Sequence, residues 1–219
     1  MIRIRIYYAK TEPMRYTGNL DINKVLERAL RRADLPLAYS QGFHPQPRMN
    51  QACPLPLGMT STAEILDCWL EEDLSLEEIN NRLQPALPPG IEVESILSVD
   101  LQEPKVQTLV DSTEYTATLL DEIPAEELSA RIQNILSADT LPRERRGKKY
   151  DLRPLIENMV MLTPDENDRQ RFLMKLAARQ GATGRADEVL DALNIQPGAA
   201  RLVRTKIHLL NPVTAQPQE

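Results

Sequence analysis

The residue types that could do chemistry are concentrated in one short stretch, SQGFHPQPR, which runs from Ser40 to Arg48. The ring of Phe43 could stack on a nucleic-acid base, and Arg48 and backbone amides could hold phosphate. Gly42 would let the backbone approach a ligand closely. Loops that combine glycine, proline, aromatic and basic residues are more often functional than decorative. We therefore expect a binding loop here, and burial of Phe43 in the core is the competing interpretation.

His44 adds a group that could move protons. A histidine with an ordinary pKa of about 6.5 suits transfer to and from a ribose 2′-hydroxyl. His44 is thus the candidate general base or acid of a metal-independent endoribonuclease, with Tyr16, Tyr39 and Lys24 as candidate partners. The only other histidine is His208, so neither a Ser-His-Asp triad nor a histidine metal site is expected.

Motifs that mark the common enzyme classes are missing from the sequence. There is no GxxxxGK[ST] phosphate loop, no GxGxxG and no HExxH. Cys53 and Cys68 match no zinc or redox spacing, and we expect both to be buried thiols. We therefore expect no metal site, no cofactor and no complete catalytic centre carried by the chain alone.

Charge is distributed unevenly along a chain whose formal net charge is -6. Residues 15–48 hold six basic and three acidic residues, and the stretch 143–153, RERRGKKYDLR, holds six and two. Residues 71–103 hold nine acidic residues and one basic residue. Basic clusters suit phosphate, because each contact releases counterions, although many charge runs are simply solvated. The acidic stretch could instead dock a basic protein.

Together these observations predict a surface for RNA built from the cations and the aromatic ring of the two basic segments. One arginine of the last expected strand, 200–210, is added because it shares a face with Lys206 and His208 by the period of two. The predicted RNA-binding residues are Arg15, Arg28, Arg31, Arg32, Phe43, His44, Arg48, Arg143, Arg145, Arg146, Lys148, Lys149 and Arg204.

The hydrophobic pattern predicts which elements carry these residues. Ile2, Ile4 and Ile6 alternate with polar residues, as in a half-buried strand, and the apolar face of the helix that follows recurs every three or four residues. In the first half, strands are expected at 2–7, 49–58, 64–71 and 91–99, and helices at 19–36 and 76–87. Pro54 and Pro56 place the second of these strands at a sheet edge.

The second half repeats the order of the first. Strands are expected at 114–120, 151–162, 171–180 and 200–210, and helices at 124–136 and 184–195. We therefore predict an α+β protein of two tandem ferredoxin-like (βαββαβ) units. Unit 1 covers 1–104 and unit 2 covers 112–219, with the basic loop 143–153 inside unit 2.

Composition fits such a chain. The 219 residues suffice for two small domains, and 42% are hydrophobic and 26% charged. No run approaches the roughly 20 apolar residues of a membrane helix, and MIRIRIYYAK lacks the apolar stretch of a secretory signal. We expect a cytoplasmic protein with no membrane partner.

Five stretches carry a resemblance to a known family: RYTGNLD, RALRRADLPLAYSQGFHPQPRM, PLPLG, RRGKKYDLRPLI and VRTKI. They resemble the radical-SAM-linked proteins, a bacterial family of unassigned function. Its members are commonly fused to, or encoded beside, a B12-type radical SAM protein, and often lie near genes for an E/G-type ribonuclease and a large-subunit ribosomal protein. The match covers most of the chain.

The resemblance implies two partners, a radical SAM protein and an RNA of the ribosomal or transfer class. The chain has no three-cysteine cluster motif, so radical chemistry would belong to the partner. The family usually has Ser-His before Leu-Asp, where this chain has Gly18 and Asn19, so a proton-transfer role there does not carry over. The resemblance still implies a binding or scaffolding role for Arg15 and Asp21.

Three functional hypotheses follow. The first is an RNA-binding accessory protein that works with a radical SAM RNA-modifying enzyme and is not catalytic by itself. The second is the endoribonuclease that uses His44, since the expected architecture also resembles the metal-independent CRISPR repeat-cleaving nucleases. The third is a protein-interaction adaptor that binds no nucleic acid.

Overall fold

The structure is a computed structural model that describes residues 1–196 and 198–210. It is a mixed α/β structure that divides into two compact units. Unit 1 comprises Met1–Val110 together with residues 208–210, and unit 2 comprises the described residues of Asp111–Ile207. Within the described residues, none of the helices combines the length and the apolar character needed to cross a membrane.

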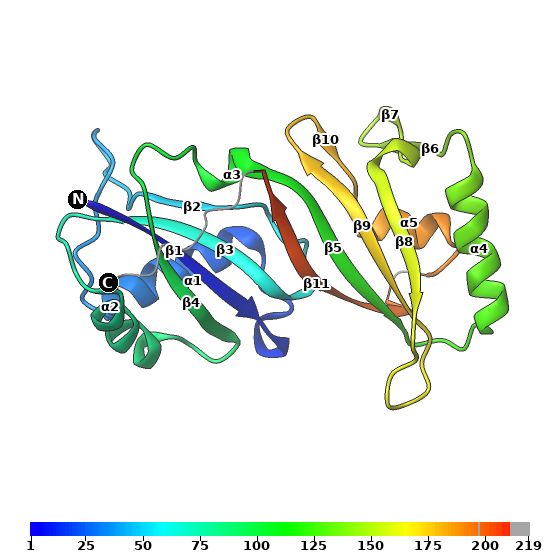
Figure 1. The fold of residues 1–219 in the computed structure, drawn as a ribbon, viewed down its shortest axis with the longest axis horizontal. Coiled ribbons are helices and arrows are strands. Elements are labelled where there is room, and N and C mark those ends of the chain that lie inside the picture. Colours follow the sequence, from blue (N-terminus) through cyan, green and yellow to red (C-terminus); the bar gives the residue numbers. More distant parts are fainter. Residues whose placement is uncertain (197, 211–219) are drawn as a thin grey trace. The chain divides into compact units, whose positions relative to one another are not determined.

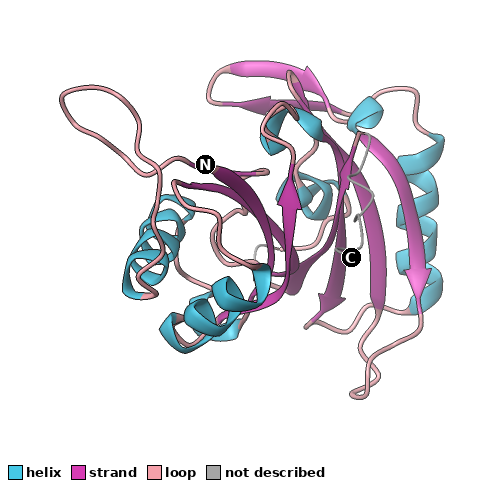
Figure 2. Ribbon diagram, turned by 60° about the vertical axis from the view of Figure 1, so that its left-hand side comes forward, coloured by secondary structure: helices cyan, strands magenta, loops and turns pink. Residues whose placement is uncertain are grey.

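Unit 1 is an antiparallel sheet with its helices packed on one face (Figures 1 and 2). The sheet order is β2-β3-β1-β4, and each neighbouring pair is antiparallel. The elements are β1 (Ile2–Lys10), α1 (Asn19–Arg32), β2 (Met49–Gln51), β3 (Thr60–Leu70), α2 (Leu76–Leu83), β4 (Ile91–Val99) and the single turn α3 (Val106–Leu109), with 3-10 turns at Glu12–Met14 and Gln84–Ala86.

The core of unit 1 forms between the sheet and helices α1 and α2. Its strand residues follow the period of two and its helix residues the three-and-four spacing, because those spacings place side chains on one face. Each buried aliphatic side chain contributes roughly 1.5–3 kcal/mol. The cluster includes Ile4, Ile6, Tyr8, Ile22, Leu26, Leu30, Leu66, Cys68, Leu70, Ile79 and Leu83.

The helix ends in unit 1 follow the sequence. Ser75 caps α2, because its hydroxyl accepts a hydrogen bond of 3.1 Å from the Glu78 N–H, as is typical of the capping-box sequence Ser-x-x-Glu. Helix α1 ends before Asp34, which adopts a left-handed φ of 52°, and the Leu35 N–H turns back to the Leu30 carbonyl. The chain then leaves toward the loop that precedes β2.

Two details of the predicted sheet are corrected. Strand β2 does lie at the sheet edge but ends at Gln51, so Pro54 and Pro56 belong to the following loop rather than to the strand. Strand β1 is buried on both faces rather than half-buried, because Arg3 and Arg5 are covered as fully as the isoleucines between them.

The opposite edge of the unit 1 sheet is acidic. Strand β4 lies beyond β1 at that edge, and both Glu92 and Glu94 on it are exposed. These two carboxylates belong to the acidic stretch 71–103, whose other members lie mainly in the β3–α2 loop and on α2. Most of the acidic stretch therefore lies in exposed positions of unit 1.

Unit 2 has the strand order β8-β9-β5-β11, and a short strand, β10, is also paired with β9. Its elements are β5 (Val110–Leu119), α4 (Ala125–Ser137), β6 (Pro142–Arg145), β7 (Lys148–Asp151), β8 (Ile156–Leu162), β9 (Arg171–Arg179), β10 (Ala182–Thr183), α5 (Ala186–Ala192) and β11 (Ala200–Leu209), with a 3-10 turn at Arg153–Leu155. Its buried side chains include Leu128, Ile132, Phe172, Met174, Leu176 and Val189.

Two other segments differ from their sequence interpretation. The expected basic loop is an ordered two-stranded hairpin, β6–β7, because the residues around Arg146 and Gly147 form a tight turn. The polar stretch 102–113, which lies between the expected strands 91–99 and 114–120, contains the helical turn α3 and the start of β5.

Candidate functional site

The loop between Ser40 and Pro47 is closed by hydrogen bonds at its base. The Ser40 N–H donates to the Gln46 carbonyl at 2.8 Å, and the Gln46 N–H donates to the Ser40 hydroxyl at 3.0 Å. Tyr39 and Pro47 form an isolated β-bridge just below. The loop extends from unit 1 close to the N-terminus (Figure 1). The backbone thus fixes both ends of the loop and leaves its tip to solvent.

The tip of this loop carries an uncovered aromatic ring. Phe43 is 101% exposed, which excludes the interpretation of Phe43 as a core residue. Gly42 beside it has a φ of +141°, a conformation that other residues rarely adopt. His44 is exposed as well, and within the described residues no hydrogen bond to its imidazole is found. The tip of the loop therefore offers the Phe43 ring as a stacking surface. It does not pair His44 with a second group for proton transfer.

Arg48 lies at the base of the loop and is held by an aromatic ring. Its guanidinium carbon lies 5.0 Å from the centroid of Trp69, and its Nη1 donates weakly to the sulfur of Met1 at 3.3 Å. Its backbone bonds to Ala38 on one side and to Trp69 on the other. Within the described residues Arg48 forms no ion pair, so its guanidinium is positioned without a carboxylate.

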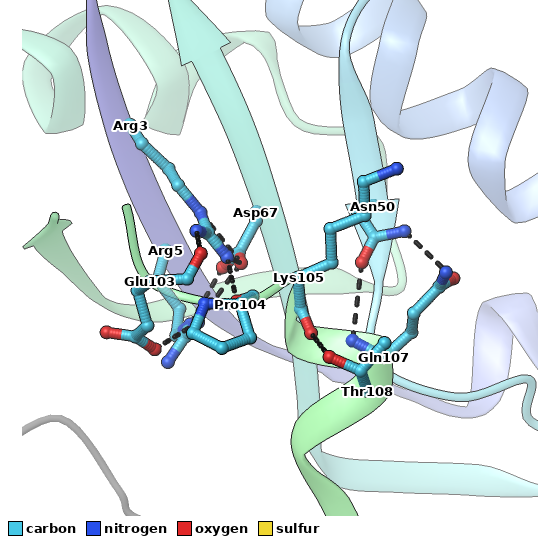
Figure 3. A network of polar contacts seen from close by, with 9 residues as sticks. All are labelled: Arg3, Arg5, Asn50, Asp67, Glu103, Pro104, Lys105, Gln107 and Thr108. Carbon is cyan, nitrogen blue, oxygen red and sulfur yellow. Dashed lines mark hydrogen bonds and ion pairs between the residues drawn. The ribbon is translucent and has the colours of Figure 1, made fainter. Parts of the chain in front are cut away.

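A buried network of charges lies on the sheet face opposite the helices (Figure 3). Both oxygens of Asp67 accept from guanidinium groups: Arg3 Nη2 at 2.5 Å, Arg5 Nε at 2.7 Å and Arg5 Nη2 at 3.0 Å. A second carboxylate, Glu103, lies 3.1 Å from Arg5 Nη2. Arg3, Arg5 and Asp67 are at most 1% exposed. Two buried positive charges are therefore matched by two negative charges.

This pairing keeps the arginines charged. Burial by itself would lower the pKa of Arg5, but the hydrogen bond and charge of Asp67, followed by the charge of Glu103, outweigh it and raise that pKa. One nitrogen of Arg5, Nη1, is buried without a hydrogen-bond partner among the described residues. The network is thus fully charged and strongly paired, although one donor is unsatisfied.

The same network fastens the segment that follows β4 onto the sheet. Arg3 donates to the carbonyls of Glu103 and Pro104 at 2.5 and 2.8 Å. Farther along, Asn50 of β2 accepts from the Gln107 N–H and donates to the Gln107 side chain (Figure 3). The segment Glu103–Gln107, which we call the strap, is held at β1 and again at β2. The strap therefore crosses the sheet face opposite the one that helices α1 and α2 cover.

The predicted cations of unit 1 have differing surroundings. Arg15 is nearly buried and donates to the Gly58 carbonyl at 2.9 Å, so it joins the RYTG and PLPLG stretches. Arg31 pairs with Glu27, and Arg32 donates to the Ala86 carbonyl. Arg28 is exposed. The structure thus brings Phe43, His44 and Arg48 into one loop but gives three of the four remaining arginines intramolecular partners.

The β6–β7 hairpin gathers the predicted cations of unit 2. Arg145 lies directly opposite Lys148 across the hairpin, and Glu144 lies opposite Lys149. Like charges placed directly opposite destabilise a strand pair. The turn between them uses left-handed backbone at Arg146, φ 50°, and Gly147, φ 75°. Three cations are thus held within four residues at the tip.

The base of the hairpin is neutralised, whereas its tip is not. Arg143, at the base, lies 3.7 Å from the carboxylate of Asp191 in α5. Tyr150 also lies near the base, and burial together with the charge of Glu188 raises the pKa of its hydroxyl. Within the described residues no ion pair involves any of the other four cations of the hairpin, Arg145, Arg146, Lys148 and Lys149. Uncompensated positive charge is therefore confined to the tip.

Arg204, the last predicted contact residue, is fully buried in β11. The face of β11 that carries Arg204 is buried at Leu202 and Arg204, whereas Lys206 on the same face is exposed. Arg204 has interactions of its own within the molecule, and an exposed contact role is inconsistent with its burial. The described residues also contain no cluster of three or more His, Cys, Asp or Glu placed to hold a metal ion.

The sequence interpretation missed the residues of the buried network. Arg3, Arg5, Asp67, Trp69 and Glu103 come from three separate segments, and Arg5 and Asp67 are 62 positions apart. The one signal present was an arginine at each polar position of the first strand, Arg3 and Arg5, together with an aspartate inside the otherwise apolar EILDCWL. Alternating arginines of this kind are also what a half-exposed strand shows, so the pattern alone does not indicate that they are buried.

Comparison with solved structures supports the fold alone. A chain of the crystal structure of a Cbf5–Nop10–Gar1 complex matches with a TM-score of 0.51 at 10% identity, and the match covers 93% of this chain and 48% of that one. A chain of the archaeal box H/ACA sRNP Nop10–Cbf5 complex matches with a TM-score of 0.48 at 10% identity, over 95% and 49%. The protein spans about half the length of these chains.

Comparison by sequence identifies a family. The search of curated proteins gives no match to the chain. The profile of DUF2344, described as an uncharacterized protein conserved in bacteria, matches residues 3–186, which include the loop at Phe43, the buried network and the β6–β7 hairpin. Since this match spans far more than half of the sequence, the chain belongs to the DUF2344 family of conserved bacterial proteins.

Proposed function

We propose that the protein binds RNA through exposed groups of both units, and that each unit is a ferredoxin-like βαββαβ fold. The strand orders support the fold proposal. In unit 1 the order is second, third, first and fourth strand, and in unit 2 the strands β8, β9, β5 and β11 repeat it. The Leu120 N–H bonds to Ala199 and the Leu210 N–H to Leu109, as expected if β5 and β11 are antiparallel.

One observation carries the functional proposal: Phe43 is fully exposed at the tip of a hydrogen-bonded loop whose base holds Arg48 without a carboxylate. A fully exposed phenyl ring has its whole aromatic face available for stacking on a partner. Stacking of single-stranded bases on an aromatic ring beside a guanidinium is a recurring mode of RNA recognition. The loop offers both groups within six residues.

The β6–β7 hairpin supports the same function by a different chemistry. Arg145 and Lys148 repel each other, and Arg146 adds a third charge at the turn. An RNA phosphate between these side chains would relieve the repulsion and release counterions. The hairpin is thus suited to the sugar-phosphate backbone, whereas the loop at Phe43 is suited to bases.

Fluorescence anisotropy of a labelled single-stranded RNA tests the proposal. The logarithm of the association constant should fall linearly with the logarithm of salt concentration, by roughly 0.7 per phosphate contact. Phe43→Ala should weaken binding by about tenfold, because stacking is worth about 1–3 kcal/mol per base. Tyr16→Ala is the matched control, since Tyr16 is also an exposed aromatic of unit 1 at 79% but lies outside the loop.

Two results would contradict this function. One is an absence of binding to any cellular RNA at low salt. The other is equal weakening by Phe43→Ala and Tyr16→Ala, since that would remove the special role of the loop. A salt dependence that survives in a Lys148→Ser, Lys149→Ser variant would exclude the hairpin from the contact surface while leaving the loop in it.

The proposed biological role is that of an accessory protein that presents a ribosomal or transfer RNA to a radical SAM modifying enzyme. The support is the sequence resemblance, together with the exposed ring of Phe43 in unit 1 and the cluster of cations at the tip of the β6–β7 hairpin in unit 2. Co-purification of the protein with a radical SAM enzyme, lost on nuclease treatment, is the expected result. Co-purification that resists nuclease would favour the adaptor hypothesis, with the acidic residues of unit 1 as the docking surface.

The endoribonuclease hypothesis gains no support from the geometry. A general base must lie within hydrogen-bond reach of a partner or of the proton that it removes. His44 is exposed, and its imidazole has no hydrogen-bonded partner among the described residues. Metal-independent RNA cleavage that disappears in His44→Ala would restore this hypothesis.

A further inference from the structure

Trp69 lies beside two guanidinium groups that come from different places in unit 1. Arg3 lies 4.9 Å and Arg48 5.0 Å from the centre of its ring. Arg3 belongs to β1 and Arg48 immediately precedes β2, and these two strands flank β3, which carries Trp69. The ring is thus the single side chain that both arginines share.

The two arginines differ in what else holds them. Arg3 is buried and bonded to Asp67 and to two carbonyls of the strap. Arg48 is exposed, and within the described residues its guanidinium has only the ring and the weak contact to Met1. Because Arg3 is fixed on the buried side, it restricts the ring, and the ring in turn restricts Arg48.

We propose that Trp69, held by Arg3, is a positioning residue that presents the Arg48 guanidinium to an RNA phosphate next to the base stacked on Phe43. This inference rests on the proposed RNA-binding function. It assigns an indirect role in that function to Arg3 and Asp67, whose side chains are at most 1% exposed, and to the two strap carbonyls that bond to Arg3.

The physical basis is that a ring positions a cation without using its donors. An ion pair would occupy the N–H groups of Arg48 and cancel its charge, whereas a cation–π contact leaves both available for phosphate. Holding a long side chain in advance also removes part of the entropy that binding would otherwise cost. Arg31 shows the contrast, because it contacts the Tyr39 ring but is also paired with Glu27.

A double-mutant cycle on RNA affinity tests the inference. In the wild-type chain, Arg48→Ala should weaken RNA binding by about tenfold, since it removes a charged hydrogen bond. In a Trp69→Phe background, where a weaker ring remains, the same change should cost only about threefold. Arg3→Lys keeps the charge but loses the planar fork. In an Arg3→Lys background, as in the Trp69→Phe background, Arg48→Ala should weaken RNA binding less than it does in the wild-type chain.

The control is an exposed cation of unit 1 without a ring contact, Arg28→Ala, whose effect should be the same in the wild-type and Trp69→Phe backgrounds. An effect of Arg48→Ala that is equally large in all backgrounds would overturn the positioning role and leave RNA binding intact. An Arg48→Ala variant that binds RNA normally would also overturn it. Failure of the wild-type chain to bind RNA would overturn both proposals together.

Fluorescence provides a second measurement that does not depend on affinity. Trp69 is the only tryptophan in the chain, so its emission reports this ring alone. Adding a single-stranded RNA should change the emission of the wild-type chain, and the change should be absent in Arg48→Ala. An unchanged emission on RNA binding would mean that the phosphate does not reach Arg48 and would overturn the inference even if affinity responds.

Discussion

Two groups of cations in this protein have similar sequences but opposite surroundings. In unit 1, Arg3 and Arg5 alternate along β1 and are buried against Asp67 and Glu103. In unit 2, Arg143 and Arg145 also alternate along β6, but the cations at the tip of the hairpin have no ion-pair partner among the described residues. The difference shows that basic residues with buried carboxylate partners serve the structure, whereas basic residues without such partners are suited to binding. The density of basic residues in the sequence does not distinguish the two groups.

The energetic consequences of the two arrangements also differ. A buried charge that loses its partner cannot be rescued by water, so the network in unit 1 is essential for stability. Charges at the hairpin tip are solvated already, and their mutual repulsion slightly weakens the unit that carries them. Stability in the first region and ligand affinity in the second should therefore respond to different mutations.

The largest expected effect is on the buried network. Asp67→Asn leaves Arg3 and Arg5 with a single carboxylate, Glu103, and should lower the free energy of unfolding by about 3–5 kcal/mol. Urea denaturation measures it. The matched control is Glu157→Gln, because Glu157 also serves two cations, Lys175 and Arg179, but at the surface. If both variants lose the same stability, burial is not what distinguishes the two regions.

Thiol labelling of Cys68 in β3 should also report the loss of stability in the Asp67→Asn variant. Cys68 follows Asp67 in β3, is fully buried, and has its pKa raised by burial, so it should resist a maleimide in the native state. In a Cys53→Ser background, Asp67→Asn should accelerate labelling of Cys68 by about two to three orders of magnitude, because opening becomes that much more frequent. Rapid labelling without this mutation would contradict the burial of β3.

The hairpin should separate stability from affinity. Lys148→Glu places an acid opposite Arg145 and should stabilise unit 2 by about 0.2–1 kcal/mol, whereas Lys149→Glu places one opposite Glu144 and should destabilise it by a similar amount. Both variants remove the same charge, so both should weaken RNA binding several-fold. Thermal denaturation and anisotropy measure the two effects. RNA affinity that follows stability would refute the proposed contact role.

The smallest effect concerns pH. Burial, aided by the charge of Glu188 and opposed by Arg145, raises the pKa of Tyr150 in the folded state. This stabilising contribution is therefore present below the ordinary tyrosine pKa and is lost as pH rises through the raised folded pKa. Compared with Tyr150→Phe, the wild-type chain should lose stability as pH rises above the ordinary tyrosine pKa of about 10. Parallel pH profiles for the two proteins would contradict this assignment.

Local patterns in the sequence account for most of the secondary structure. The alternation of Ile2, Ile4 and Ile6 places them in the core, and the Ser75 cap is where the capping box predicts it. Period-two patterns, however, state only that two faces differ. They assign Arg3 and Arg5 to solvent, and the buried partner that reverses this assignment lies 62 or more positions away.

The candidate site was predictable only in part, for a similar reason. The composition of residues 40–48 indicates a binding loop, but whether Phe43 packs inward or is exposed depends on tertiary contacts. In the hairpin, Arg146 and Gly147 favour a tight turn locally, whereas the pairing of Arg143 with Asp191 depends on the packing of α5. Trp69 could not be connected to Arg48 without knowing that their strands are neighbours.

The acidic residues of strand β4 affect how readily the protein aggregates during synthesis and at high concentration. A sheet edge presents unpaired backbone groups to which any extended chain can add, and this is how ordered aggregates begin. Glu92 and Glu94 place negative charge along that edge, so a second copy that approached it would meet its own charge. The acidity of this stretch thus gives unit 1 protection against self-assembly, whether or not a basic protein ever docks there.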